Sequence, residues 1–219
     1  MDRSSIAIGI AVVIPALNEA ATIQQVVHAA LPYGRCVVVD DGSSDDTANL
    51  ARAAGATVVS HPTNRGYDAA LDSGFRQAAQ TGCEAIITLD ADGQHNPALL
   101  GKFVAALEGG AAVVLGVRDR RQRLAEHVFA WYTQARFGIS DPLCGMKAYR
   151  VDVYKALGHF DAYQSIGTEL MLFAARRGFA MTSIPFEVRE RNGQPRFANR
   201  LVGNWRIFRA LALSFFRVK

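Results

Sequence analysis

The sequence has 219 residues, half of them apolar, which suffices for the core of one domain, or of one domain with an appendage. Its net charge of +4 is uneven, because residues 189–219 carry eight arginines and lysines against one acid whereas residues 1–188 are net acidic. No apolar run reaches the about 20 residues of a membrane-spanning helix, no signal peptide is recognisable, and three widely spaced cysteines are typical of a reduced, cytoplasmic protein.

Apolar runs alternate with helical patterns along the first half of the chain. Strands are predicted at 10–15, 36–40, 56–60, 86–89 and 111–117, and helices at 20–30, 46–54, 67–80 and 97–107. The strand runs are continuously apolar rather than alternating, which is typical of parallel strands that are buried on both faces. We therefore expect an α/β fold with a mostly parallel, Rossmann-like central sheet and helices on both faces.

Polar or glycine-containing sets follow all five predicted strands. They are Asn18 with Glu19, Asp40 with Asp41, residues 64–66, Asp90 with Asp92 and Gln94, and finally Arg118. Ligands of such folds bind outside the carboxyl ends of the strands, which meet at one edge of a parallel sheet. We therefore expect these sets to form one ligand site. Neither a GxGxxG nor a GxxxxGK[ST] pattern is present, which disfavours an ordinary dinucleotide fold and a P-loop.

Asp90 and Asp92 stand one residue apart at the end of a buried strand. Two carboxylates in this position repel each other and cannot stay there unpaired, and a divalent cation removes the conflict. With Gln94 they offer oxygen ligands, which suit Mg²⁺ or Mn²⁺ bound together with a substrate phosphate. The pattern predicts a metal site that holds a nucleotide diphosphate, and the alternative is a solvated Asp-Gly turn.

Four motifs together resemble family 2 glycosyltransferases of the GT-A fold. They are residues 13–19 (VIPALNE), 39–47 (VDDGSSDDT), 64–67 (NRGY) and 89–97 (LDADGQHNP). Their order and spacing are most similar to the dolichyl- or polyprenyl-phosphate mannosyl- and glucosyltransferases. The resemblance covers about residues 10–190. The resemblance implies a GT-A domain over 1–190. It also implies a reaction that transfers a hexose, with inversion, from a donor of the GDP-mannose or UDP-glucose type to an acceptor. The acceptor expected first is a polyprenyl phosphate.

The resemblance also implies roles for residues of each motif. Four residues are expected to line the nucleotide pocket, namely Pro15, Leu17, Asn18 and Glu19. Asp41 is expected to contact the base or the ribose, and Gly66 to lie beside the donor. Asp90, Asp92 and Gln94 are expected to hold Mg²⁺ or Mn²⁺ against the donor diphosphate, where the metal offsets the charge that grows on the leaving nucleoside diphosphate.

The second half of the chain matches the family with changes. A family segment near Asp-x-x-Ser-Gly-Phe-Arg corresponds to residues 141–147, where Lys147 replaces the arginine and a bidentate phosphate clamp becomes a point charge. Glu169 matches the superfamily's acid and is the candidate general base, which a sugar hydroxyl needs and an ionised phosphate does not. The alternative for Glu169 is an acid favoured by the start of a helix. Arg118 is placed to meet a phosphate, and with Asp92 and Glu169 it completes the predicted catalytic set.

Two departures from the family concern the substrates. The segment between Arg118 and Asp141, which shapes the acceptor side, is shorter than in the lipid-phosphate enzymes. Asp68 stands where relatives often have glycine. Its carboxylate either hydrogen-bonds a sugar hydroxyl or faces solvent.

Residues 191–219 form a basic, apolar and aromatic segment after the predicted domain. This segment either makes a peripheral contact with the inner face of a membrane, through residues 200–217, or packs on the sheet as an amphipathic helix. Nucleic acid is not an expected partner, because the polar edge of the sheet suits a ligand of nucleotide size.

Three other functions stay open. The acceptor could be a saccharide in polysaccharide or glycolipid synthesis. A nucleotidyltransferase also holds a metal between paired acids on an α/β sheet. A catalytically degenerate protein that binds a nucleotide is the third alternative.

Overall fold

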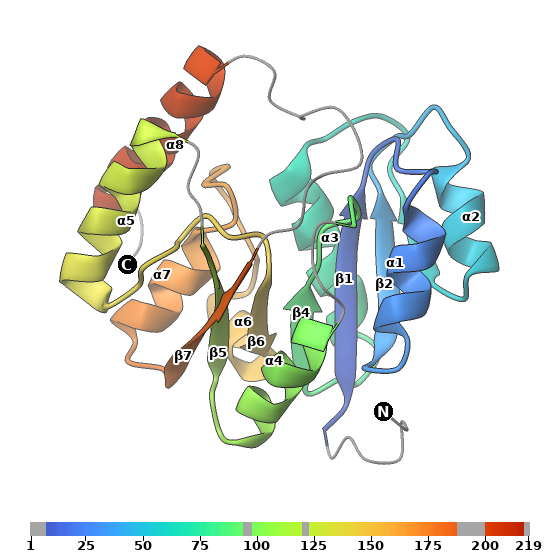
Figure 1. Cartoon of the computed structure of the whole chain (residues 1–219), viewed down its shortest axis with the longest axis horizontal. Helices are drawn as coiled ribbons and strands as arrows, with labels where there is room; N and C mark the ends of the chain where they lie inside the picture. The colour runs from blue at the N-terminus through green and yellow to red at the C-terminus, as the bar shows by residue number, and fades with distance from the viewer. Residues whose placement is uncertain (1–7, 94–97, 120–122, 188–199, 217–219) are drawn as a thin grey trace.

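The computed structural model describes residues 8–93, 98–119, 123–187 and 200–216. Its strands form one sheet in the order β3-β2-β1-β4-β6-β5-β7 (Figure 1). They are β1 (Ile10–Ala16), β2 (Arg35–Asp40), β3 (Thr57–Ser60), β4 (Ala85–Thr88), β5 (Val113–Arg118), β6 (Lys147–Arg150) and β7 (Met181–Phe186). β6 runs antiparallel to its neighbours β4 and β5, and the other pairings are parallel. The prediction of a mostly parallel sheet is confirmed.

Helices cover both faces of this sheet, as predicted. They are α1 (Ile23–Ala30), α2 (Thr47–Ala53), α3 (Tyr67–Ala79), α4 (Ala98–Glu108), α5 (Leu124–Phe137), α6 (Val151–Leu157), α7 (Glu169–Arg176) and α8 (Arg200–Phe216). Alternate residues of β1 point to opposite faces: Val12 and Ile14 join a core with α1, α2 and α4, whereas Ala11 and Val13 join one with α3, α6 and α7. In Figure 1, α5 and α8 lie together at one end of the sheet.

The topology collects the functional motifs at one edge of the sheet. The parallel strands β1, β2, β3, β4 and β5 all end at this edge. Because β6 is antiparallel, its first residue, Lys147, also lies there. Helix α7 leads back to the start of β7, so Glu169 at its first turn lies towards the same side.

Several local predictions differ from the structure. The first helix begins at Ile23 rather than at residue 20, and in the turn before it the Glu19 carbonyl accepts from the amides of Thr22 and Ile23. Strands β6 and β7 and helices α5 and α6 were not predicted. The expected domain boundary near residue 190 lies outside the described residues.

Helix α8 packs against α5, where Ile207 and Ala210 meet Ala125 and Phe129 in a small core of their own. Within the described residues, no helix has both the length and the apolar character needed to cross a membrane. The structure therefore places the described part of the tail on α5.

Candidate functional site

The loops after β1 and β2 are joined by hydrogen bonds into one wall of the site. The Asn18 amide donates to Ser43 Oγ (2.9 Å), and Asn18 Oδ1 accepts from the Ser44 amide (2.8 Å). The Glu19 amide donates to Thr47 Oγ1 (2.9 Å). Asn18 has a φ of 54°, in the left-handed region that asparagine tolerates better than most residues. Two of the motifs that resemble a nucleotide site therefore meet in the fold.

Pro15 and Leu17 border this wall in different ways. Pro15 is buried within β1, opposite Val39 of β2, whereas Leu17 is half-buried in the loop that follows. Leu17 is therefore the one of the two that presents side-chain surface at the edge of the sheet. The contact of either residue with a nucleotide stays a prediction.

Asp41 is buried and fixes the turn before α3. Its Oδ1 accepts from the Arg65 amide (2.9 Å), and its Oδ2 accepts from the Gly66 amide (2.8 Å). His61 donates from Nδ1 to Asp41 Oδ1 (2.7 Å), and its Nε2 lies 2.9 Å from Ser73 Oγ. Because a carboxylate only accepts hydrogen bonds, Asp41 orients the histidine ring and the turn together. Its predicted contact with the base or ribose stays a prediction.

Gly66 occupies the corner between this turn and α3. Its φ of 93° lies in the left-handed region, and a Cβ there would meet no atom within 4 Å. The backbone conformation, rather than crowding, therefore favours glycine. The open space in front of Gly66 suits a position beside the donor.

Asp90 lies between the first turn of α3 and the segment before β6. Tyr67 Oη donates to Asp90 Oδ1 (3.3 Å). A Cβ on Gly145 would lie only 2.3 Å from Asp90 Oδ2, so the carboxylate packs directly on the Gly145 backbone. Thr88 Oγ1 donates to the Gly145 carbonyl (2.6 Å) and holds that backbone in place. The position of this carboxylate thus requires glycine at 145.

Asp90 and Asp92 fit a hard divalent cation by their chemistry, since both carboxylates are half-buried at the end of β4. Thr22 Oγ1 donates to the Ala91 carbonyl (2.7 Å) and fixes the backbone between them. Gln94, the third predicted ligand, lies outside the described residues. In the part of the chain that the structure describes, no group of three or more His, Cys, Asp or Glu side chains could hold a metal by itself. Oxygens of a substrate diphosphate would complete the coordination, as is usual for Mg²⁺.

Arg118 forms a two-point ion pair with Asp141. Its Nε donates to Asp141 Oδ2 and its Nη2 to Asp141 Oδ1, both at 2.8 Å, and Nη2 lies 3.4 Å from Glu126 Oε2. Burial alone would raise the pKa of Asp141, but the hydrogen bonds and charge of Arg118 hold it below its usual range. Much of the guanidinium is thereby committed inside the protein, and its contact with a substrate phosphate stays a prediction.

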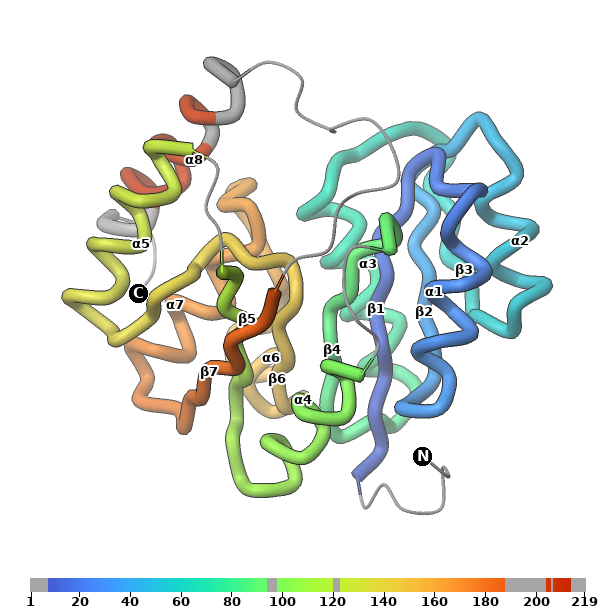
Figure 2. Tube along the Cα trace, viewed as in Figure 1, coloured from blue at the N-terminus to red at the C-terminus, as the bar shows by residue number. Residues whose placement is uncertain are grey.

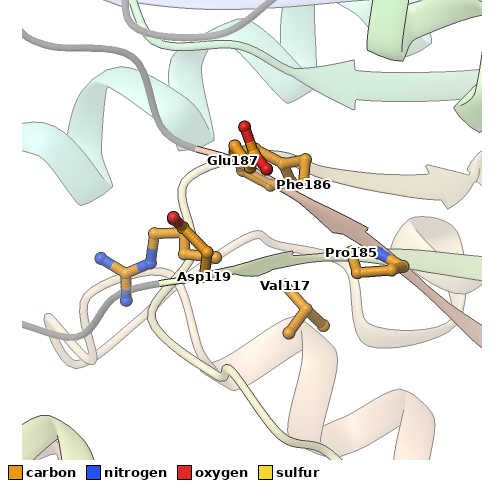
Figure 3. A pocket seen from close by; sticks show the side chains of 6 residues that line it. Val117, Asp119, Pro185, Phe186 and Glu187 are labelled. Carbon is orange, nitrogen blue, oxygen red and sulfur yellow. The ribbon is translucent and has the colours of Figure 1, made fainter.

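Beside Arg118, a hollow of about 450 Å³ opens where β5 and β7 end. Val117, Pro185 and Phe186 give it apolar walls, and the carboxylates of Asp119 and Glu187 lie on the two strand ends around it (Figure 3). The hollow combines apolar surface with the two carboxylates and the Arg118 side chain, a combination that suits a polar ligand.

Glu169 is the first residue of α7 and is buried. Its Oε1 lies 2.9 Å from His159 Nε2, and its Oε2 accepts from the Ala162 amide (2.5 Å). Both carboxylate oxygens therefore have partners within the loop that precedes α7. The predicted role of Glu169 as a general base stays a prediction.

Asp68 and Lys147 hold the same loop from the other side. Asp68 Oδ2 accepts from the Ile166 amide (3.3 Å), and buried Lys147 donates through Nζ to the Gly167 carbonyl (2.9 Å). Burial lowers the pKa of Lys147, although neighbouring acids oppose this shift. Asp68 Oδ1 is buried and has no hydrogen-bond partner among the described residues. The Asp68 carboxylate thus binds a backbone amide, a contact that was not expected, and its hydrogen bond to a sugar hydroxyl stays a prediction.

Sequence reasoning missed four residues that position this site, namely His61, Tyr67, Thr88 and Gly145. Tyr67 and Gly145 do stand inside segments that resemble the family. The motifs therefore indicated that these residues belong to the site, but not which contacts they make. Nothing in the sequence around His61 and Thr88 indicates their contacts with Asp41 and the Gly145 carbonyl, because these contacts depend on tertiary packing.

Comparison with known proteins places the chain in a family. The family described as "Glycosyl transferase family 2" matches residues 11–127. An uncharacterized glycosyltransferase of Mycobacterium tuberculosis is 34% identical over 84% of this chain and 87% of its own length. A polyprenol monophosphomannose synthase of Mycolicibacterium smegmatis is 31% identical over 82% of this chain and 77% of its own.

A solved structure has the same architecture. Glucosyl-3-phosphoglycerate synthase from Mycobacterium tuberculosis, in complex with Mn²⁺, UDP and glucosyl-3-phosphoglycerate, superposes with a TM-score of 0.75 and 26% identity, covering 95% of this chain and 79% of that one. The same synthase has also been solved with Mg²⁺ and UDP, and that structure superposes with a TM-score of 0.76. The GT-A fold predicted from the sequence is thus confirmed, and the chain belongs to glycosyl transferase family 2.

Proposed function

We propose that this glycosyltransferase moves a hexose from a nucleoside diphosphate sugar to a polyprenyl phosphate, with inversion at the anomeric carbon. The observation that supports this most is the Asp90 carboxylate held by Tyr67 against Gly145, at the sheet edge that also carries the β1 and β2 loops. The polyprenol monophosphomannose synthase among the relatives supports the lipid-phosphate acceptor. The solved synthase that binds UDP with Mn²⁺ or Mg²⁺ supports a metal-dependent nucleotide-sugar donor of the GDP-mannose or UDP-glucose type.

In this proposal, Asp90 and Asp92, with Gln94, hold Mg²⁺ or Mn²⁺ against the donor diphosphate. The metal, when bound, stabilises the charge that grows on the departing nucleoside diphosphate. The protein's own contribution is orientation: Tyr67 and Gly145 set the angle of the Asp90 carboxylate before the donor arrives. Such preorganisation keeps the carboxylate from reorienting during the reaction.

The nucleotide lies against the wall formed by the loops after β1 and β2. Leu17 and Asn18 border it there, beside the buried Glu19. Asp41 acts on the donor side through the turn that it fixes, whose last residue is Gly66. In the proposal Asp41 acts by positioning this turn, since both of its carboxylate oxygens already accept hydrogen bonds from the protein.

A phosphate acceptor is ionised and attacks the anomeric carbon without a base. The two hydrogen bonds that Glu169 accepts, from His159 and the Ala162 amide, agree with a reaction in which Glu169 positions the loop before α7. Arg118 uses Nε and Nη2 for Asp141 and Glu126, so Nη1 is the part of its guanidinium that would meet the acceptor phosphate.

A second candidate is transfer to a saccharide. It is favoured by the hollow at the ends of β5 and β7, where Asp119 and Glu187 could accept hydrogen bonds from hydroxyl groups and Phe186 could pack on a sugar ring. For this acceptor Glu169 would have to leave its partners and act as the base.

The lipid-linked acceptor of the first candidate instead fits a cytoplasmic protein that contacts the inner face of the membrane peripherally, through residues 200–217.

The test uses the full chain with Mn²⁺, GDP-mannose or UDP-glucose, and either a water-soluble short-chain prenyl phosphate or an oligosaccharide. We expect release of nucleoside diphosphate and a prenyl-phosphate hexose of inverted anomeric configuration, identified by mass spectrometry and NMR. Gly145→Ala should lower both turnover and Mn²⁺-dependent nucleoside diphosphate affinity at least about tenfold, or about 1.4 kcal/mol in binding. Gly9→Ala is the control, because a Cβ there meets its nearest atoms at 3.7 Å.

Each other outcome overturns the proposal in a definite way. Release of pyrophosphate identifies a nucleotidyltransferase, and a glycosylated oligosaccharide establishes the second candidate. Binding of nucleoside diphosphate without any turnover identifies a degenerate binding protein. Unchanged affinity in Gly145→Ala removes Asp90 from the metal site.

A further inference from the structure

The large apolar side chains that lie exposed on the described part of the chain are all on two helices. On α5, Leu124 is 73%, Val128 is 37% and Trp131 is 74% exposed, and on α8, Trp205 is 65% and Phe208 is 43% exposed. The spacing of four and then three along α5 places its three residues on one stripe of the helix, and the two residues of α8 also share a side. These five side chains are called the α5–α8 face below.

The two helices form a packed pair rather than two separate projections. Ala125 and Phe129 of α5 meet Ile207 and Ala210 of α8 in a buried core. Figures 1 and 2 both show the pair side by side at the end of the sheet opposite α2. The α5–α8 face is therefore carried by two helices that pack on each other, and exposed apolar side chains gathered in this way mark a contact surface.

The charge of the pair restricts what this surface can contact. Helix α8 contains three arginines and no acid. The one acid of α5, Glu126, is buried and lies 3.4 Å from Arg118, whereas Arg136 is exposed. Among the side chains that the structure describes, the two helices thus carry one exposed arginine, Arg136, and no exposed carboxylate, and the sequence of α8 adds further arginines and no acid. An anionic lipid surface complements both its apolar and its charged parts.

We propose that the α5–α8 face docks on an anionic bilayer, with Leu124, Val128 and Trp131 of α5 entering the interface beside Trp205 and Phe208 of α8. This goes beyond a contact made by the C-terminal segment alone, because it assigns half of the surface to a helix inside the catalytic domain. Tryptophan is well suited to this position, since its ring is apolar and its N–H can stay hydrated. The choice of a bilayer as the occupant rests in part on the proposed lipid-linked acceptor.

The face is also connected to the acceptor side of the site. Through Glu126, α5 contacts Arg118 at the end of β5. Through Arg209, whose Nη1 donates to the Tyr163 (3.1 Å) and Gln164 (3.4 Å) carbonyls, α8 contacts the loop that leads to Glu169. A bilayer bound to the α5–α8 face would therefore bring lipid phosphates to the part of the site where the acceptor is expected.

The test is flotation of the full chain with vesicles of phosphatidylcholine, with and without phosphatidylglycerol. We expect binding that increases with phosphatidylglycerol and falls at least about tenfold in Leu124→Gln/Trp131→Gln, with a separate loss in Trp205→Gln/Phe208→Gln. Lys102→Gln, at an exposed cation of α4, is the matched control and should bind as the unmodified chain does. Far-ultraviolet circular dichroism and turnover of the water-soluble acceptor show that each variant is folded.

The outcomes separate this inference from the proposed function. Flotation of Leu124→Gln/Trp131→Gln equal to that of the unmodified chain overturns the role of α5, and absence of any vesicle binding overturns the whole face. A dimer in sedimentation that becomes monomeric in Leu124→Gln/Trp131→Gln, without vesicle binding, assigns the face to a second copy and also overturns the inference. Vesicle binding without transfer to a prenyl phosphate refutes the acceptor but leaves the docking face standing.

Discussion

At the scale of single residues, Asp68 has surroundings that disfavour a negative charge. Its Oδ2 accepts one long hydrogen bond, from the Ile166 amide, and its Oδ1 is buried without a partner among the described residues. Burial and the nearby charge of Asp161 raise the pKa of Asp68 to about 7. The carboxyl group is therefore protonated in a large share of molecules at neutral pH, and this makes stability depend on pH.

The sign of this dependence follows from the two pKa values. Because an unfolded aspartate has a pKa of about 3.9, between about pH 4 and 7 the folded chain keeps a proton at Asp68 that the unfolded chain has lost. Its contribution to the free energy of unfolding therefore falls as pH rises through this window. We expect Asp68→Asn, which stays uncharged, to gain about 2 to 3 kcal/mol relative to the unmodified chain between pH 5 and pH 8. Urea unfolding at both pH values measures this difference.

Asp152→Asn serves as the control, because Asp152 is an exposed acid in the first turn of α6. This variant also removes one carboxylate, and it should not show the gain that is expected for Asp68→Asn. Parallel pH profiles for Asp68→Asn and the unmodified chain would show that Asp68 is ionised in the fold and would refute this account.

Among the elements, α3 links the site to the sheet. Its first turn supplies Tyr67 and Asp68, and one side of the helix lies on β1 at Gly74. A Cβ at Gly74 would lie 2.3 Å from Val13 Cγ1 and 3.1 Å from Val39 Cγ2. The missing side chain at Gly74 therefore sets the distance between α3 and the sheet, and with it the position of the first turn.

The substitution Gly74→Ala has two opposing effects on stability, and their sizes can be compared. Alanine favours a helix interior over glycine by about 1 kcal/mol, whereas overpacking a core costs about 1 to 3 kcal/mol. Because Val13 and Val39 are both fully buried, we expect the packing cost to win and the free energy of unfolding in urea to fall. In a Val13→Ala background the cost of Gly74→Ala should shrink. An equal cost in both backgrounds would argue against a contact with Val13.

The elements also show what the sequence could predict. The strands from β1 to β5 and the helices between them follow from continuous apolar runs and helical periodicity, because each run is long enough to be buried as a unit. β6 could not be predicted in this way: it has four residues with charged ends, Lys147 and Arg150, and it exists because β4 and β5 pair with both of its sides. Helix α5 was missed for a similar reason, since its exposed stripe of Leu124 and Trp131 obscures its amphipathic pattern.

For the whole molecule, the parallel topology explains why the polar sets at 18–19, 40–41, 64–66 and 90–92 could be predicted to share one edge. The topology does not predict which of these side chains bind the substrate directly, because that depends on side-chain contacts within the fold. Asp41 and Arg118, both expected to touch substrate, turn out to be engaged with His61 and Asp141. Those partners lie 20 or more residues away in the sequence, so no local sequence pattern predicts these contacts.

The C-terminal helix contacts the loop before α7 through one polar side chain, Arg209, in addition to the apolar packing of Ile166 on the core shared by α5 and α8. Arg209 Nη1 donates to the Tyr163 and Gln164 carbonyls, and the next residues of the loop are held by Asp161, which accepts from the amides of Ser165 (2.9 Å) and Gly167 (3.2 Å). Gln164, with a φ of 57°, has a left-handed backbone that neighbouring contacts must stabilise. Loss of the Arg209 contacts should therefore loosen the loop before α7.

We expect Arg209→Met, which keeps much of the apolar length of the side chain, to increase the amide exchange of Ser165 and Gly167 by about tenfold, or about 1.4 kcal/mol of local opening. Amides of β1 and β4 should keep their protection, because Arg209 contacts neither strand directly. Arg76→Met is the control, since Arg76 is an exposed residue of α3 that pairs with Asp72 of the same helix. Hydrogen exchange followed by mass spectrometry resolves these segments. If residues 161–168 exchange at the same rate in both variants, the hydrogen bonds of Arg209 do not stabilise the acceptor side of the site.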